Sequence, residues 1–456
     1  MDLLKNLFKG DKVVWIIFLF LCLISMIEVF SATSTLSFKS GNHWTAITNH
    51  TTFLIFGAFV VLIVHNLNYR FFQLAPFILL PLSFFMMLFI SIMGHITGDK
   101  VNGAARWFEI AGVQFQPSEL AKMGIIIFVA FILARNQQEK REGAKEKKNG
   151  SSAFKIISIV TGFFVVLIGM ENISTALLLM LVVLMMMFIG RIETRKMLLT
   201  LGTLALGVLL AVSAIMLAPD APEPAAEETT ETVTSADIPQ EKERSTFGLG
   251  RFSTAKQRIL RFLNNKEVPP EEYDMDKNAQ EAHAHIAIAS SNIIGKLPGN
   301  SVERDFLSQA FSDFIFAIII EELGLIGGIF VISLYIVLLV RAGRIAQKAR
   351  GDFASFLVLG IALLIVTQAL VNMSVAVGLI PVTGQPLPLI SKGGTAILIN
   401  AAYFGMILSV SRYTANLEKK QGDLPDTELS KEQIIKDQER LEEAERNQTE
   451  RPNEEA

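Results

Sequence analysis

The sequence predicts an all-α integral membrane protein with about ten transmembrane helices and both termini in the cytoplasm. Of its 456 residues, 51% are hydrophobic and only 19% are charged. The apolar residues come in blocks of roughly 17 to 25, the length of helix that crosses a hydrocarbon core of about 30 Å. The blocks lack the period-two alternation of a β-barrel, so helices are the structure that pairs every backbone amide within lipid.

The first predicted span is a retained helix. The N-terminus superficially suggests a signal peptide, but its apolar part is too long and no small-residue cleavage site follows cleanly. Cys22 is the only cysteine, which excludes an intramolecular disulfide. The second and fifth of the predicted spans are short, so nine spans are an alternative. In chain order the predicted spans are 13–33, 51–67, 74–96, 119–136, 154–170, 173–190, 196–218, 314–340, 353–380 and 391–411.

Lysine and arginine in the loops predict the orientation. The basic segments 1–12, 135–155 and 341–350 all fall on the cytoplasmic side if the N-terminus is inside, whereas the short opposite loops hold few basic residues. The chain therefore divides into a cytoplasmic N-terminus (1–12), a membrane domain (13–413) and a charged cytoplasmic tail (414–456). The tail has too few apolar residues to fold by itself, so we expect disorder or a solvated helix.

One large extracytoplasmic loop, 219–313, is predicted between the seventh and eighth spans. Its first part, 219–245, is acidic and rich in Pro, Thr and Ala, which is typical of a flexible insertion. Basic and apolar residues alternate in 251–263. This second pattern fits equally well a helix in the headgroup layer and a short helix packed on the protein.

The segment NGAARWFEIAGVQFQPSELAK, 102–122, puts unusual polar chemistry beside a span. An Arg-Trp pair at a membrane boundary is commonly an interface anchor. Here a helix also begins near the Pro, and a helix N-terminus is a natural anion site. A Glu and a Lys three residues apart share one face of that helix. The polar residues of interest are Arg106, Trp107, Gln116, Ser118, Glu119 and Lys122.

The segment SDFIFAIIIEELG, 312–324, opens the eighth span. Asp313 stands where the outer loop meets the helix, and spacing alone favours a capping role for it. Glu321 and Glu322 lie within or near the apolar run, so at least one of them must face protein or water.

The segment GLIPVTGQPLPLISKGGTAILIN, 378–400, interrupts the apolar pattern with prolines and glycines and includes Ser391 and Lys392. Irregular backbone at membrane depth survives only where it is buried in protein or lines a cavity. Broken segments of this kind often border a binding site. Because all three polar segments fall on the outer side, we expect an outward-facing cavity.

Together, and in this order within ten spans, the three segments resemble the SEDS family of bacterial shape, elongation, division and sporulation proteins, which includes FtsW, RodA and SpoVE. The resemblance covers about residues 12–413. It implies a glycosyltransferase that polymerises lipid II outside the cytoplasmic (inner) membrane and releases undecaprenyl pyrophosphate. It also implies a class B penicillin-binding protein as the transpeptidase partner, with other divisome or elongasome membrane proteins. We expect no nucleic acid partner.

The resemblance places the catalytic acidic residue at Asp313, which reverses the preference for a cap. A carboxylate there can accept the proton of an attacking sugar hydroxyl. The leaving pyrophosphate needs Lys, Arg or a divalent cation, Mg or Mn, rather than a second carboxylic acid. The sequence offers no dedicated metal site, so such a cation would be held by Asp313 or Glu119 with the substrate's phosphates. The substrate-binding residues we expect are Arg106, Trp107, Gln116, Ser118, Glu119, Lys122, Glu322, Ser391 and Lys392.

Three departures from the family pattern stand near these motifs. Phe311-Ser312 replaces a common His-Thr before the aspartate, Glu171-Asn172 alters a Pro-Asp-x-Gly-Thr pattern, and Lys392 replaces a common Tyr. The long charged tail and the Ser-Ala-Thr after the first helix lean toward FtsW, but division and elongation both stay open.

Two other functions remain alternatives. A lipid II flippase or other transporter would also have about ten spans and a polar cavity, but transporters tend to show internal repeats and midplane ionisable residues. We find no convincing repeat, and the charged residues within the spans are few, chiefly Glu28 and Glu171 near the outer ends. A non-catalytic scaffold for the penicillin-binding protein would keep the fold but would not require Asp313.

Overall fold

The computed structural model describes residues 9–33, 45–96, 108–110, 113–141, 146–193, 195–197, 275–307, 310–349 and 351–422. The described chain is helical apart from one short hairpin. Its helices are α2 (Lys12–Ala32), α4 (Thr45–Asn66), η1 (Tyr69–Gln73), α5 (Ala75–Ile96), α6 (Pro117–Arg141), α7 (Glu146–Glu171), α8 (Ile173–Ile189), α11 (Met275–Ser290), η3 (Glu303–Asp305), α12 (Ile315–Lys348), α13 (Asp352–Ala376) and α14 (Gly394–Gly422).

Seven of the described helices contain stretches long and apolar enough to cross a membrane, and shorter apolar stretches occupy α5 and α8. These nine correspond to nine of the ten predicted spans. The remaining one, 196–218, lies outside the described residues except for its first two, and the segments 219–245 and 251–263 lie outside them entirely. The multi-pass membrane fold predicted from composition is therefore confirmed.

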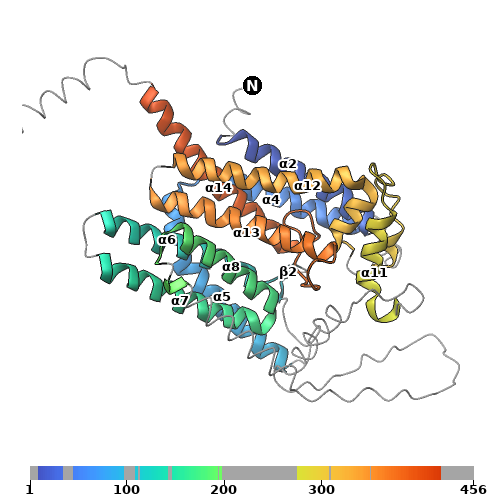
Figure 1. Cartoon of the computed structure of the whole chain (residues 1–456), viewed down its shortest axis with the longest axis horizontal. Helices are drawn as coiled ribbons and strands as arrows, with labels where there is room; N and C mark the ends of the chain where they lie inside the picture. The colour runs from blue at the N-terminus through green and yellow to red at the C-terminus, as the bar shows by residue number, and fades with distance from the viewer. Residues whose placement is uncertain are drawn as a thin grey trace, which may run out of the picture.

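The long helices run side by side as a bundle (Figure 1). α4 packs along α14, α12 along α13, and α5 along α6, while α13 also contacts α6. α6, α13 and α14 are mostly buried in this arrangement. α4 and α7 instead turn large apolar side chains outward, among them Phe56, Phe59 and Phe163. Such a face suits lipid, since a membrane protein need not hide apolar surface from acyl chains.

The start of α2 and the end of α14 lie at one end of the bundle, whereas α11 lies at the other (Figure 1). We call these the cytoplasmic and outer ends, after the orientation predicted from the basic residues of the loops. Asp11 joins two elements there: its Oδ1 accepts the Val13 amide at 2.9 Å and caps α2, and its Oδ2 lies 2.6 Å from Arg341 Nε on α12. α14 runs on to Gly422, so the tail predicted to begin at 414 starts as a continuation of the last span.

A two-stranded hairpin precedes α6, a detail that the all-α prediction did not include. β1 (Phe108–Ile110) pairs antiparallel with β2 (Val113–Phe115), with Phe108 opposite Phe115. β2 lies against α14. The hairpin thus ties the segment before α6 to the last helix and helps to set where α6 begins.

Candidate active site

The irregular segment 381–393 connects α13 to α14 at the outer end of the bundle, and its backbone carbonyls are satisfied by side chains of surrounding helices. Gln368 Nε2 donates to the Pro386 carbonyl at 3.0 Å, and Asn372 Nδ2 to the Gln385 carbonyl at 2.8 Å. Both donors lie on α13, one turn apart. Because an unpaired carbonyl in a membrane interior costs several kcal/mol, these contacts explain how the segment tolerates its broken backbone.

Two further helices, α12 and α2, also donate hydrogen bonds to carbonyls of the irregular segment. Tyr335 of α12 donates its hydroxyl to the Pro388 carbonyl at 2.6 Å, and Ser25 of α2 donates to the Ile390 carbonyl at 2.8 Å. Leu389, between these two carbonyls, is buried with a φ of +65°. The segment is therefore held from α2, α12 and α13 in one conformation.

The same segment is fastened to the residues around Asp313. Ser391 Oγ donates to the Ser312 carbonyl at 2.6 Å, and the Lys392 amide donates to the Phe311 carbonyl at 2.8 Å. Asn372 Nδ2 also donates to the backbone carbonyl of Asp313 at 2.8 Å. The chain on either side of the predicted catalytic carboxylate is consequently fixed by both the segment and α13.

The Asp313 side chain is half-buried. Its Oδ1 accepts the Ser312 hydroxyl at 3.0 Å, and a Cβ placed on Gly384 would lie 3.6 Å from its Oδ2. α12 itself begins at Ile315, with Phe314 rather than Asp313 as its N-cap residue. Asp313 thus stands just before the helix, beside the irregular segment, with part of its side chain open to solvent.

Glu119 and Lys122 form an ion pair at the start of α6, with 2.7 Å between Lys122 Nζ and Glu119 Oε1. Lys122 is fully buried and Glu119 is nearly so. Lys122 Nζ also donates to Gln368 Oε1 at 3.2 Å. Since Gln368 in turn holds the Pro386 carbonyl, the pair is connected to the irregular segment through one amide side chain.

The start of α8 reaches the same segment. Asn172 caps α8 by accepting the amides of Ser174 at 3.0 Å and Thr175 at 3.3 Å. Thr175 Oγ1 accepts from Gln385 Nε2 at 2.6 Å. Glu171 and Asn172, which depart from the family pattern, therefore mark the boundary between α7 and α8. This boundary places Thr175 against Gln385 of the irregular segment.

Lys392 and Phe311, two further departures from the family pattern, touch each other. Lys392 Nζ lies 5.0 Å from the centre of the Phe311 ring, within range of a cation–π contact. Partial burial lowers the pKa of Lys392 from its ordinary value. The ammonium group thus lies beside the Phe311 ring, in an environment less polar than water.

Glu322 is placed apart from this cluster. Its carboxylate accepts the amides of Gly299 at 3.0 Å and Ser301 at 3.2 Å, and the hydroxyl of Ser31. Neighbouring Glu321 accepts Lys296 Nζ at 2.6 Å. Both glutamates are buried and face protein, and they anchor the outer segment 296–302 to α12.

Of the other predicted site residues, Ser118 is buried and Gln116 half-buried at the start of α6. Arg106 and Trp107 lie outside the described residues. The structure thus gathers Asp313, Glu119, Lys122, Ser391 and Lys392 around the irregular segment. Their roles in substrate binding and chemistry stay predictions.

Four residues of the cluster were missed at the sequence level: Thr175, Gln368, Asn372 and Gln385. Gln368 and Asn372 did carry a signal, because two amide side chains four residues apart on an otherwise apolar span share one helix face. Polar side chains at such positions usually face the bundle interior and have a function.

The side chains gathered around the irregular segment supply only some of the ligands that a divalent cation needs. In the portion of the chain that the structure describes, no three His, Cys, Asp or Glu side chains are grouped to hold a metal ion. Glu119 is already paired with Lys122. Asp313 by itself offers one carboxylate, so any cation would depend on phosphate oxygens of a substrate.

Named relatives match most of the length of the chain. The chain is 26% identical over 411 residues to a probable peptidoglycan glycosyltransferase FtsW from Geobacter sulfurreducens, which covers 89% of this chain and 96% of the relative. It is 25% identical over 420 residues to the protein of the same name from Enterococcus hirae, covering 91% and 96%.

Two solved structures share the fold. A chain of the structure described as "Structural coordination of polymerization and crosslinking by a peptidoglycan synthase complex" matches with a TM-score of 0.63 at 21% identity, covering 89% of this chain and 98% of that one. The rod shape determining protein RodA of Thermus thermophilus matches with a TM-score of 0.57 at 20% identity, covering 89% and 98%. At the level of sequence families, residues 11–416 match the FtsW, RodA and SpoVE family, described as "Cell cycle protein", and the chain belongs to that family.

Proposed function

We propose that the protein is a peptidoglycan glycosyltransferase that polymerises lipid II at the outer face of the bacterial inner membrane. The observation that carries this proposal is the position of Asp313: a half-buried carboxylate at the outer end of the bundle, held by hydrogen bonds from Ser391 and Asn372 to the adjacent backbone. The relatives named as glycosyltransferases support the same activity.

The chemistry requires one base and a place for negative charge. The acceptor hydroxyl attacks the anomeric carbon of the donor sugar and gives its proton to the Asp313 carboxylate. The new glycosidic bond forms as the bond from the anomeric carbon to the pyrophosphate oxygen breaks, and undecaprenyl pyrophosphate departs with the bonding electrons. A divalent cation, if one is required, would supply further charge stabilisation at those phosphates.

Among the residues that the structure describes, Lys392 is the best-placed cation for the departing pyrophosphate. Its amide is bonded to Phe311, two residues before Asp313, so the ammonium and the carboxylate are held on adjoining backbone. Lys122 is a poorer candidate, because it is fully buried and already bonded to Glu119 and Gln368. We assign Lys122 to positioning of the irregular segment.

The partner in this proposal is a class B penicillin-binding protein, which would cross-link the peptides of the new strand. One structural neighbour comes from a complex that coordinates polymerization and crosslinking. A chain with this fold would act in the same kind of assembly, in division or elongation.

The test is lipid II polymerisation by the purified chain with its cognate penicillin-binding protein, whose own ability to form glycosidic bonds has been removed by mutation. Glycan strands in this mixture are the expected result. Lipid II translocation in vesicles without any polymer would identify a flippase instead. If neither occurs and the partner still binds, the chain is a scaffold.

A further inference from the structure

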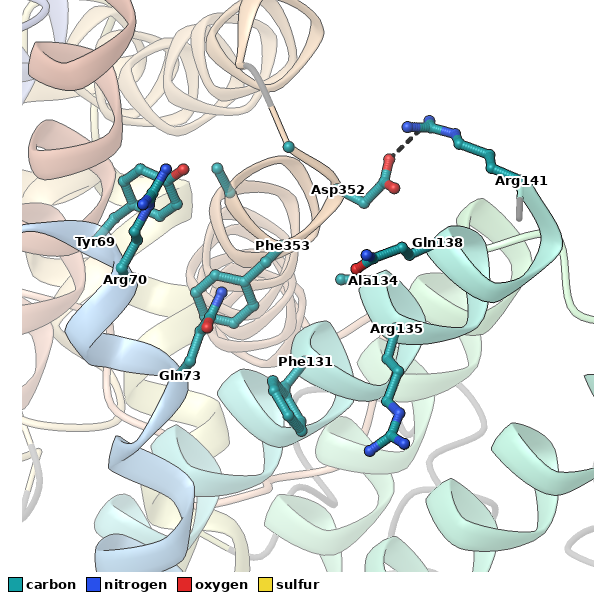
Figure 2. A pocket seen from close by; sticks show the side chains of 12 residues that line it. Tyr69, Arg70, Gln73, Phe131, Ala134, Arg135, Gln138, Arg141, Asp352 and Phe353 are labelled. Atoms are coloured by element: carbon teal, nitrogen blue, oxygen red, sulfur yellow. Dashed lines mark hydrogen bonds and ion pairs between the residues drawn. The ribbon is translucent and has the colours of Figure 1, made fainter. Parts of the chain in front are cut away.

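A cavity of about 510 Å³ lies at the cytoplasmic end of the bundle, opposite the end that carries Asp313. Figure 2 shows its walls: η1, the C-terminal part of α6 and the first turn of α13. The polar lining includes Arg70, Gln73, Arg135, Gln138 and Arg141, with Asp352 as its acidic member. None of these residues takes part in the proposed reaction.

The arginines of the cavity are only partly balanced by carboxylates. Arg141 Nη2 lies 3.0 Å from Asp352 Oδ1, and Arg135 Nε lies 3.0 Å from Glu139 Oε1. No carboxylate in the described part of the chain lies within ion-pair distance of Arg70. Arg70 thus adds a positive charge at the cavity that the described protein leaves uncompensated.

The start of α13 adds to this positive character. Gly351 to Ala354 line the cavity, and α13 begins directly after Gly351, which has no side chain to cap it. The first amides of a helix carry a partial positive charge and bind anions. Three arginines and the start of α13, where Asp352 pairs with Arg141, thus line one cavity, and arginine side chains favour an anion with several oxygens, such as a phosphate group.

The apolar wall of the cavity points to a lipid as the source of that phosphate. Phe131 lines the cavity, and its ring meets the edge of Phe77 on α5 with centroids 5.9 Å apart. Phe77 is itself exposed, as are Phe71, Leu74 and Ile78 around it. The cavity is therefore continuous with a lipid-facing surface along which acyl chains can lie. A soluble anion or an acidic peptide would make no use of this surface.

We propose that this cavity binds the phosphate headgroup of an anionic phospholipid from the inner leaflet. Arg70 contacts the phosphate, Arg135 adds charge at the rim, and the acyl chains follow Phe71 to Ile78. The bound lipid bridges η1, α6 and α13. Because α6 and α13 carry Lys122 and Gln368 at their outer ends, lipid binding would stabilise the same helix pair that supports the candidate active site.

The test uses the full-length protein in detergent, with binding of phosphatidylglycerol and phosphatidylcholine of the same acyl chains followed by native mass spectrometry. We expect saturable binding of phosphatidylglycerol in preference to phosphatidylcholine. The variant Arg70→Ala/Arg135→Ala should bind phosphatidylglycerol at least about tenfold more weakly, because charge-assisted hydrogen bonds to phosphate are lost. Arg344→Ala removes an exposed arginine on the cytoplasmic part of α12, outside the cavity, and should bind like the wild type.

Several results would overturn the proposal. Equal binding of phosphatidylglycerol by the double variant and the wild type would exclude these arginines. Competition by millimolar inorganic phosphate as effective as that by the lipid would indicate a free phosphate site. Arginine-dependent binding of a Glu-rich peptide, with no preference for phosphatidylglycerol, would indicate a protein partner. As a control for misfolding, the variants and the wild type should unfold at the same temperature.

Discussion

Lys122 is a fully buried cation whose burial is tolerated because its ammonium has two partners. Glu119 supplies the opposite charge at 2.7 Å, and Gln368 accepts a further hydrogen bond at 3.2 Å. A buried pair of this kind adds little net stability compared with an apolar pair of similar volume, but losing one partner leaves an uncompensated charge.

This asymmetry predicts the outcome of a double-mutant cycle. Lys122→Met should lower the free energy of unfolding by about 3–5 kcal/mol, because Glu119 is left buried and unpaired. The double variant Lys122→Met/Glu119→Gln should recover much of that loss. Unfolding by denaturant in detergent measures both. Additive effects of the two single substitutions would show that the residues do not act as a pair.

Lys392 makes a prediction about pH. Partial burial lowers its pKa, so the side chain loses its proton at a lower pH than an ordinary lysine does. If its charge stabilises the leaving pyrophosphate, polymerisation should decline as pH rises through this lowered pKa. Lys392→Arg should keep the charge and move the decline to higher pH. Superimposable pH–rate profiles of the two proteins would exclude this role.

At the scale of elements, the irregular segment 381–393 depends on donors from three helices. Asn372 is the most informative of them, because its Nδ2 serves the carbonyls of both Gln385 and Asp313. A carbonyl that loses its buried partner costs about 1–3 kcal/mol. The conformation of the segment and the position of Asp313 are therefore coupled through one side chain.

Asn372→Leu should accordingly reduce polymerisation by about tenfold or more, since both carbonyls lose their donor. Asn400→Leu is the matched control: Asn400 is also buried, but its Nδ2 bonds to the Ala396 carbonyl of its own helix. Initial rates of both variants should be compared at equal amounts of folded protein. If the two substitutions affect the rate equally, the segment does not depend on Asn372.

The backbone of α12 departs from helical geometry at one residue, Gly324. Gly324 has a φ of +71°, and a Cβ there would lie 2.2 Å from the Ile293 carbonyl oxygen of the outer segment. Gly324→Ala should therefore destabilise the protein by at least about 1–3 kcal/mol. Gly343→Ala, on the same helix with open space around it, should be neutral or stabilise by up to about 1 kcal/mol. Equal thermal stability of the two variants would contradict the close approach.

The membrane fold of the whole molecule could be predicted, because the lengths of the apolar blocks and the charges of the loops are both properties of the local sequence. Counting the predicted spans also placed the three polar segments on the same, outer side of the membrane. The donors that hold them together could not be predicted. Ser25 and the Ile390 carbonyl are separated by 365 positions, and no local pattern pairs them. The kink at Gly324 depends in the same way on the outer segment that packs against it.

Glu322 shows a second kind of information that the sequence does not contain, namely the role of a buried carboxylate. The apolar run indicated only that at least one of Glu321 and Glu322 faces protein or water, and both are buried in protein. A charged residue in a span suggests a functional site by default, but the structure shows this carboxylate bonded to backbone amides of the outer segment. Sequence alone does not distinguish a carboxylate that binds substrate from one that anchors a loop, because both need burial and nearby donors.

The role of Asp313 is tested by the rate of lipid II polymerisation by Asp313→Asn in the presence of a penicillin-binding protein that cannot form glycosidic bonds. Asparagine keeps the size of the side chain but cannot accept the hydroxyl proton, so we expect at least about a hundredfold loss of rate with unchanged stability and partner binding. Asp305→Asn, at an outer aspartate away from the cluster, should retain activity. Polymerisation by a folded Asp313→Asn protein at the wild-type rate would show that Asp313 is not the catalytic base.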